Sequence, residues 1–102
     1  MTWEIDGLVN QTLFIQPGAT VYVTLVNPDW GYMHGFEVTK TTPPYSQTPM
    51  MTADHVFMLQ ALTNARYHVI EGEMTLQSGT YYYICPVPGH AQSGMFGRLN
   101  VT

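Results

Sequence analysis

Apolar and polar residues alternate along most of the chain with a period of two, which is typical of half-buried β-strands. The stretch 20–27 is the clearest case, because Val21, Val23 and Leu25 fall on one face. Further strands, most of them bounded by Gly, Pro, Asn or Ser turn signals, are predicted at 2–6, 12–16, 34–40, 65–70, 73–77, 80–84 and 98–101. This spacing predicts an all-β protein, an antiparallel Greek-key β-sandwich of seven or eight strands forming a single domain over residues 1–102.

Two stretches depart from the alternation. The prolines of 41–51 predict an irregular crossover that packs on the sandwich without joining a sheet. The apolar residues of 53–64 do not alternate cleanly, so a short helix and a broken strand are both open. Glu71 and Gly72 are expected to form a turn between two strands.

The composition excludes several classes of function. Charged residues make up 10% of the 102 residues and the net charge is −4, so there is no basic surface for nucleic acid. A single cysteine excludes an internal disulfide and every multi-cysteine zinc or iron–sulfur framework. No run reaches the roughly 20 apolar residues of a membrane span, and the start carries no secretion signal, so we expect a mature or truncated form of a protein that could be membrane-anchored at full length.

The C-terminal region carries the candidate chemistry. A run of aromatic residues leads to Cys85, and a loop rich in Pro and Gly then supplies His90 and Met95 at intervals of five residues. One thiolate, two imidazoles and a weak axial thioether are the ligands of a blue copper electron-transfer site, whereas Mg²⁺ and Ca²⁺ prefer oxygen. This pattern requires a second histidine from elsewhere.

His34 is the expected second imidazole, because the alternation of 34–40 turns its side chain toward the core. The competing histidines are His55, which has no soft neighbour, and His68, which is expected on the solvated face of a strand. Other interpretations of the same residues stay open: Cys85 as a buried hydrophobe or as a nucleophile paired with His90.

The remaining methionines and tyrosines have simpler interpretations. Met33, Met50 and Met51 are expected to pack in the core or loops rather than to form a copper-delivery cluster. The three tyrosines at 81–83 are expected to pack, with hydroxyls at the rim.

The chain resembles the cupredoxins, the type 1 blue copper proteins, and within them the rusticyanin and sulfocyanin family of acid-loving microbes. The motifs that carry the resemblance are Tyr-Tyr-Tyr-Ile-Cys at 81–85, Pro-Gly-His at 88–90, Gly-Met-Phe-Gly at 94–97 and His-Gly-Phe at 34–36. The resemblance implies a plastocyanin-like domain with one copper ion held by His34, Cys85, His90 and Met95. Many members place Asn or Ser directly after the first histidine, where this chain has Gly35.

The resemblance also implies a role. It implies an electron carrier rather than an enzyme, in an acidophile-type respiratory chain, outside the cytoplasm or in the periplasm. A monomer that exchanges electrons with a c-type cytochrome or a terminal oxidase is expected, acid-stable and docking through an apolar rim of Pro86, Val87, Pro88, Ala91 and Met95 around His90.

Two rivals belong to other classes. A domain of a larger copper oxidase is one, although Ile84 and Pro86 flank the cysteine where multicopper oxidases place histidines. A copper chaperone or store is the other, which would favour exposed Met or Cys clusters.

Overall fold

The computed structural model describes residues 2–29, 31–46, 55–61 and 68–102, with the backbone alone at 55, 60 and 61. Within these ranges the chain forms β-strands and turns, and the strands account for all of the regular secondary structure. The nine strands run in chain order as follows: β1 (Glu4–Ile5), β2 (Leu8–Val9), β3 (Leu13–Ile15), β4 (Thr20–Asn27), β5 (His34–Thr39), β6 (His55–Ala61), β7 (His68–Thr75), β8 (Gly79–Ile84) and β9 (Phe96–Val101).

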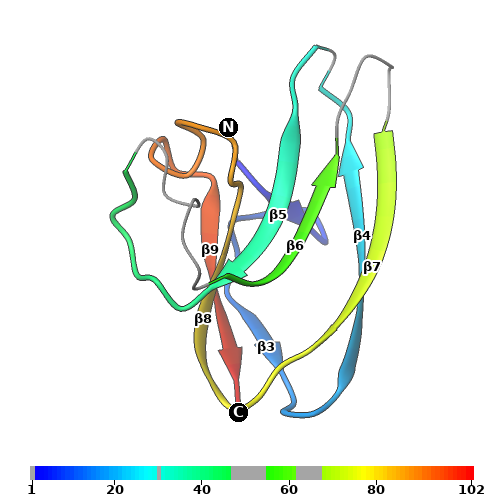
Figure 1. Ribbon diagram of the computed structural model, residues 1–102, viewed down its shortest axis with the longest axis vertical. Helices are drawn as coiled ribbons and strands as arrows, with labels where there is room; N and C mark the ends of the chain where they lie inside the picture. Colours follow the sequence, from blue (N-terminus) through cyan, green and yellow to red (C-terminus); the bar gives the residue numbers. More distant parts are fainter. Residues whose placement is uncertain (1, 30, 47–54, 62–67) are drawn as a thin grey trace.

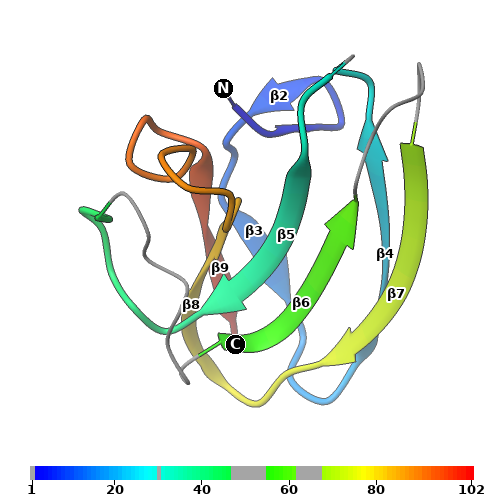
Figure 2. The ribbon, with the colours of Figure 1, turned by 45° about the horizontal axis from the view of Figure 1, so that its top comes forward.

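Seven strands build a sandwich, and the two-residue strands β1 and β2 form a small hairpin beside it. One sheet has the order β3-β9-β8-β5-β6, and the other is the pair β4-β7. Figures 1 and 2 show β4 and β7 together at one side, β8 and β9 at the other, and β5 and β6 between them. The all-β sandwich predicted from the alternation is therefore confirmed.

The five-stranded sheet is mixed rather than purely antiparallel. β3 pairs parallel to β9, with Leu13 opposite Leu99 and Ile15 opposite Val101. Two strands from nearly opposite ends of the chain thus lie side by side. The other pairings in the sandwich are antiparallel, as expected.

β7 is one continuous strand, so the predicted turn at Glu71 and Gly72 is wrong. It pairs with β4 along its whole length, with Gly72 opposite Val23. A Cβ at position 72 would lie 3.1 Å from the Phe57 ring and 3.2 Å from a Leu59 methyl group. Gly72 therefore provides room for the facing sheet inside a strand and does not mark a turn.

Within 53–64 the structure describes residues 55–61, and these form the strand β6 rather than a helix. Val56 and Met58 are exposed, while Phe57 and Leu59 pack partly buried against the core. The period of two is present, but apolar residues occupy both faces and hide it in the sequence.

Both faces of β5 are covered, and all six of its residues are buried. Phe36 and Val38 point into the main core, whereas the alternate positions, Glu37 and Thr39, are buried on the opposite face. Tyr45, in the segment after β5, is buried in a second small cluster with Ile84 and Ala91. The alternation of 34–40 predicts the face that His34 shares with the core, and it does not show that the polar face is covered as well.

The main core is rich in aromatic rings. Trp3 meets Phe36 and Tyr83 edge-on, and Tyr83 stacks on Phe36 with ring centroids 5.8 Å apart. The Tyr83 hydroxyl donates to the Gln11 carbonyl at 2.6 Å, and burial raises its pKa to about 12. Tyr81 and Tyr83 are packing residues, as predicted, but Tyr83 is fully buried, so its hydroxyl does not lie at the rim.

In the described part of the chain no helix has the length and apolar character needed to cross a membrane.

Candidate metal site

The end of β8 delivers Cys85 to the interior. The strand stops at Ile84, and the Cys85 backbone N–H donates to the Met95 carbonyl at 3.1 Å, so the start and end of the 85–95 loop are joined. Cys85 is fully buried. Its thiol is therefore held at a defined point below the loop.

The loop turns back on itself through short-range backbone hydrogen bonds. The His90 N–H donates to the Val87 carbonyl, and the Met95 N–H donates to the His90 carbonyl, both at 3.0 Å. Gly89 and Gly94 adopt positive φ angles of 84° and 112°, which non-glycine residues rarely adopt. The Pro- and Gly-rich sequence thus folds so that His90 returns toward Cys85.

The N-terminal hairpin holds the far end of the loop. The Asn10 side chain accepts from the Trp3 backbone N–H at 2.8 Å and donates to the Gly94 carbonyl at 2.9 Å. The sequence predicted no role for Asn10, and only its contact with a residue far along the chain reveals one.

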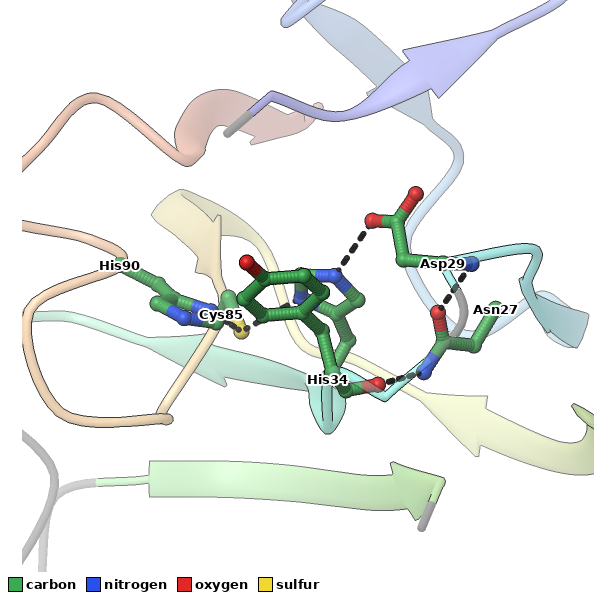
Figure 3. A network of polar contacts seen from close by, with 6 residues as sticks. Asn27, Asp29, His34, Cys85 and His90 are labelled. Carbon is green, nitrogen blue, oxygen red and sulfur yellow. Dashed lines mark hydrogen bonds and ion pairs between the residues drawn. The ribbon is translucent and has the colours of Figure 1, made fainter. Parts of the chain in front are cut away.

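His34, Cys85 and His90 come together, and one ligand atom from each lies within 4.8 Å of the others. The Cys85 Sγ is 3.8 Å from the His34 Nδ1 and 3.3 Å from the His90 Nδ1. Figure 3 shows the two imidazoles on either side of the sulfur. His34 begins β5 and is buried, whereas His90 is half-buried on the loop.

Met95 lies beside this cluster and is also buried. It lines a cavity of about 800 Å³ together with His34, Trp3 and Asp29. Its backbone bonds to both Cys85 and His90 hold it in the same loop as two of the donors.

The two competing histidines lie apart from the cluster. His55 is opposite Thr39 in the β5–β6 register, at the other end of β5 from His34, a separation of about 17 Å along a strand; its side chain lies outside the described residues. His68 is opposite Asn27 at the start of β7 and is half-buried rather than fully solvated. Met50 and Met51 lie outside the described residues, and Met33 is exposed.

The electrostatics of the metal-free protein favour the neutral forms of Cys85 and His90. Burial raises the pKa of the Cys85 thiol, and the backbone N–H groups of Gly35 and Val87 act in the opposite direction. The pKa of His90 is lowered, first by burial and then by the charge of His34 and the N-terminus, with Asp29 opposing this effect. A metal cation would reverse the balance at Cys85, since it favours the thiolate.

Gly35 contributes through its backbone and through its lack of a side chain. A Cβ at this position would lie 3.0 Å from the Pro86 Cγ and 3.1 Å from its Cδ, which is tighter than ordinary contact. The absence of a side chain therefore lets the residue after Cys85 pack directly against β5. Where many family members have an Asn or Ser side chain, Gly35 acts on the sulfur through its backbone N–H.

The apolar rim around His90 is smaller than predicted. Pro88 is exposed and Pro86 and Val87 are half-buried, so these three residues form the rim. Ala91 and Met95 are buried, because the loop folds over them, and their inclusion in the rim is wrong.

One contact at the site, between Asp29 and His34, is not predicted from the sequence. The Asp29 carboxylate accepts a hydrogen bond from the His34 Nε2 at 2.7 Å. The Asn-Pro-Asp sequence at 27–29 is typical of a loop, but nothing in its pattern indicates that the carboxylate turns toward a histidine five residues later.

The donor set fits a soft or borderline metal ion. One sulfur and two imidazole nitrogens, with no carboxylate among the three donors, suit copper or zinc. Two bonds of ordinary length to one ion separate the donor atoms by about 3.5 Å, close to the two spacings from Cys85. Burial of the sulfur and of His34 suits a retained ion rather than a rapidly exchanged one.

Comparison with known proteins gives a consistent result. The family described as "Sulfocyanin (SoxE) domain" matches residues 3–102. Rusticyanin from Acidithiobacillus ferrooxidans (strain ATCC 23270) is 36% identical over 104 residues, covering 98% of this chain and 54% of the relative. A second rusticyanin from A. ferrooxidans is 37% identical, with 98% and 66% of the two chains covered. The chain thus spans about half to two thirds of the length of these relatives.

Solved structures show the same similarity in three dimensions. A structure of the copper protein rusticyanin superimposes with a TM-score of 0.89 at 35% identity, covering 99% of this chain and 67% of the other. Rusticyanin from Thiobacillus ferrooxidans gives a TM-score of 0.85 at 35% identity, with the same coverage.

Proposed function

The chain belongs to the sulfocyanin family of cupredoxins, and on that premise we propose that it is an electron carrier with one type 1 copper ion. The single observation that supports this most is the convergence of the Cys85 Sγ with the Nδ1 atoms of His34 and His90. In this proposal these three residues are the strong ligands and Met95 is the weak axial ligand of a single domain spanning 1–102. Copper supplies a one-electron couple between Cu(I) and Cu(II) when it is bound.

The protein residues determine how that couple is used. Cys85 and His34 are buried at the end of paired strands, so they hold their donor atoms in place whatever the charge of the site. The half-buried His90 is the donor nearest solvent and serves as the electron port. No substrate pocket or acid–base pair is required, since the protein is a carrier and not an enzyme.

The face around His90 is the proposed docking surface for redox partners. Pro86, Val87 and Pro88 form an apolar rim, which suits the small, quickly released interfaces of electron-transfer complexes. A c-type cytochrome and a terminal oxidase are the partners we propose. The setting we propose is an acidophile-type respiratory chain outside the cytoplasm.

The burial of the donors argues against a copper chaperone. A chaperone exposes its ligands so that a partner can take the ion, whereas Cys85 is 0% and His34 only 4% exposed. A relay domain of a larger copper oxidase would have the same donors and would differ only in the further domains joined to it.

Addition of Cu(II) to the purified metal-free protein tests the proposal. We expect an intense blue thiolate-to-copper band that saturates at one ion per chain, and its loss in Cys85→Ser. A reversible redox titration together with slow handover of copper to a chelator would identify a carrier. A colourless complex, or handover as fast as mixing, would contradict the proposal.

A further inference from the structure

The Asp29–His34 contact reaches beyond the three donors. The Asp29 Oδ2 lies 2.7 Å from the His34 Nε2, the ring nitrogen that faces away from Cys85 (Figure 3). The His34 side chain is 5% exposed and the Asp29 side chain is 51% exposed. The buried imidazole is thus linked to the cavity surface through one carboxylate.

This contact selects the tautomer of His34. An ionised carboxylate accepts hydrogen bonds and cannot donate one, so the proton of the neutral ring must lie on Nε2. The lone pair is then on Nδ1, the atom that points at the Cys85 Sγ from 3.8 Å. The free donor atom of His34 is therefore aimed into the metal site before any ion binds.

Asn27 holds the backbone that carries the Asp29 carboxylate. Its buried side chain accepts from the Asp29 backbone N–H at 3.0 Å and donates to the Tyr32 carbonyl at 2.7 Å. A further bond from the Tyr32 N–H to the Asp29 carbonyl, at 3.3 Å, closes the loop. The backbones of Asp29 and Tyr32 are thus both fastened to the last residue of β4, which fixes the point from which the Asp29 side chain reaches His34.

We infer that Asp29 is a positioning residue that fixes the donor tautomer of His34 and lowers the reduction potential of the site. The second part rests on the proposed function. A carboxylate that accepts a hydrogen bond from the Nε2–H makes Nδ1 a stronger electron-pair donor to the metal. The negative charge of the carboxylate also favours the more highly charged Cu(II) over Cu(I). Both effects stabilise the oxidised protein relative to the reduced one.

The variant Asp29→Asn tests the inference because it keeps the size and removes the charge. An amide can donate as well as accept, so either tautomer of His34 can bond to it. Long-range proton–nitrogen NMR of the metal-free protein at pH 8 should show the Nε2–H tautomer alone in the unmodified chain and a mixture in Asp29→Asn. This readout needs no copper.

Voltammetry of the copper-loaded proteins supplies the second readout. Loss of such a partner typically costs 10- to 100-fold in metal affinity. We expect Asp29→Asn to lower the preference for Cu(II) over Cu(I) by about tenfold, which corresponds to a rise in potential of about 59 mV. Glu4→Gln is the matched control, because Glu4 is exposed on the wall of the same cavity and loses the same charge.

The outcomes separate the inference from the proposed function. A mixture of tautomers together with a raised potential in Asp29→Asn, and a much smaller rise in Glu4→Gln, supports the inference. An unchanged tautomer and potential in a blue Asp29→Asn protein overturns it and leaves the copper site intact. Equal shifts in both variants also overturn it, since they indicate a general charge effect. If the unmodified chain does not turn blue, the proposed function fails, and the metal-free NMR experiment alone decides whether Asp29 sets the tautomer.

Discussion

The two imidazoles that face Cys85 lie in different surroundings. His34 is buried at the start of a strand and bonded through its far nitrogen, whereas His90 is half-buried on a turn. The sequence motif places Cys85, His90 and Met95 in one loop. The alternation of 34–40 predicted His34 rather than His68 as the second imidazole. Only the structure shows that the start of β5 meets the loop, because alternation predicts which face a residue occupies and not which strand ends lie together.

Replacement of single histidines should separate ligands from bystanders. His34→Ala should weaken or alter the blue band, because it removes a buried donor that faces the sulfur, while His68→Ala and His55→Ala should leave the band intact. Copper titration followed by absorption measures this. Bleaching in His68→Ala with a normal band in His34→Ala would refute the assignment.

Met95 should tune the potential rather than create the site. Met95→Leu should raise the reduction potential, because it removes a weak donor that favours Cu(II), and Met95→Gln should lower it, because an amide oxygen is a harder donor. Voltammetry of both blue variants measures the shifts. Unchanged potentials in the two variants would mean that Met95 only packs.

At the scale of the strands, close contact between neighbouring residues decides where glycine is needed. The pattern of apolar residues predicts most strands, including β4, β5 and β8, but it does not distinguish a glycine that marks a turn from one that makes room inside a strand. Gly72 lies inside β7 beneath Phe57, and Gly97 lies inside β9 beneath Tyr83. Such positions depend on what the facing side chain does, which a single sequence does not record.

Gly97→Ala should destabilise the fold. A Cβ at this position would run into the ring and hydroxyl of Tyr83, which is fully buried and cannot retreat. We expect a loss of about 1 to 3 kcal/mol in the free energy of unfolding, the usual cost of overpacking. Urea denaturation measures it.

Gly79→Ala is the control in the neighbouring strand. A Cβ at this position would meet the Tyr81 ring at an ordinary 3.4 Å. A stability change of less than about 0.5 kcal/mol is expected here, as for other substitutions without a named defect. Equal losses in the two variants would show that Tyr83 is not the cause.

At the scale of the whole molecule, the small number of charges governs the response to acid. Only seven carboxylates are available for protonation, so the usual route of acid unfolding is weak. The histidines at the metal site are then the sensitive groups. Their protonation competes with metal binding, because an imidazole must be neutral to bind a metal.

The metal-free protein should lose stability as the pH falls below about 6.5, the ordinary value for histidine. The pKa of His90 is lowered in the folded state, so the unfolded chain takes up the proton first and is favoured as the pH falls toward the folded pKa. Above pH 6.5 both states are neutral at this residue and no stability is lost. Thermal denaturation between pH 8 and pH 4 measures this trend, and a midpoint that stays constant would contradict it.

The copper-loaded, oxidised protein should respond differently and stay folded and blue near pH 3. Bound Cu(II) keeps His34 and His90 deprotonated, which removes their contribution to acid unfolding. Absorption and circular dichroism recorded together test this. Loss of both signals between pH 5 and pH 4 would count against an acid-stable carrier.

The parallel pairing of β3 with β9 carries a consequence for the order of folding. Every rung of that ladder joins residues from nearly opposite ends of the chain, and the Thr102 N–H adds a further bond to the Ile15 carbonyl. Such a high contact order makes folding slow, on the scale of milliseconds to seconds for β-sandwiches. A long loop must close, at a cost in entropy, before the pairing contributes any stability. On the ribosome β3 emerges long before its partner exists, so it must wait unpaired until β9 has been synthesised. The loop with Cys85, His90 and Met95 lies directly before β9, so nascent chains should become competent to capture copper only once β9 has been synthesised and can pair.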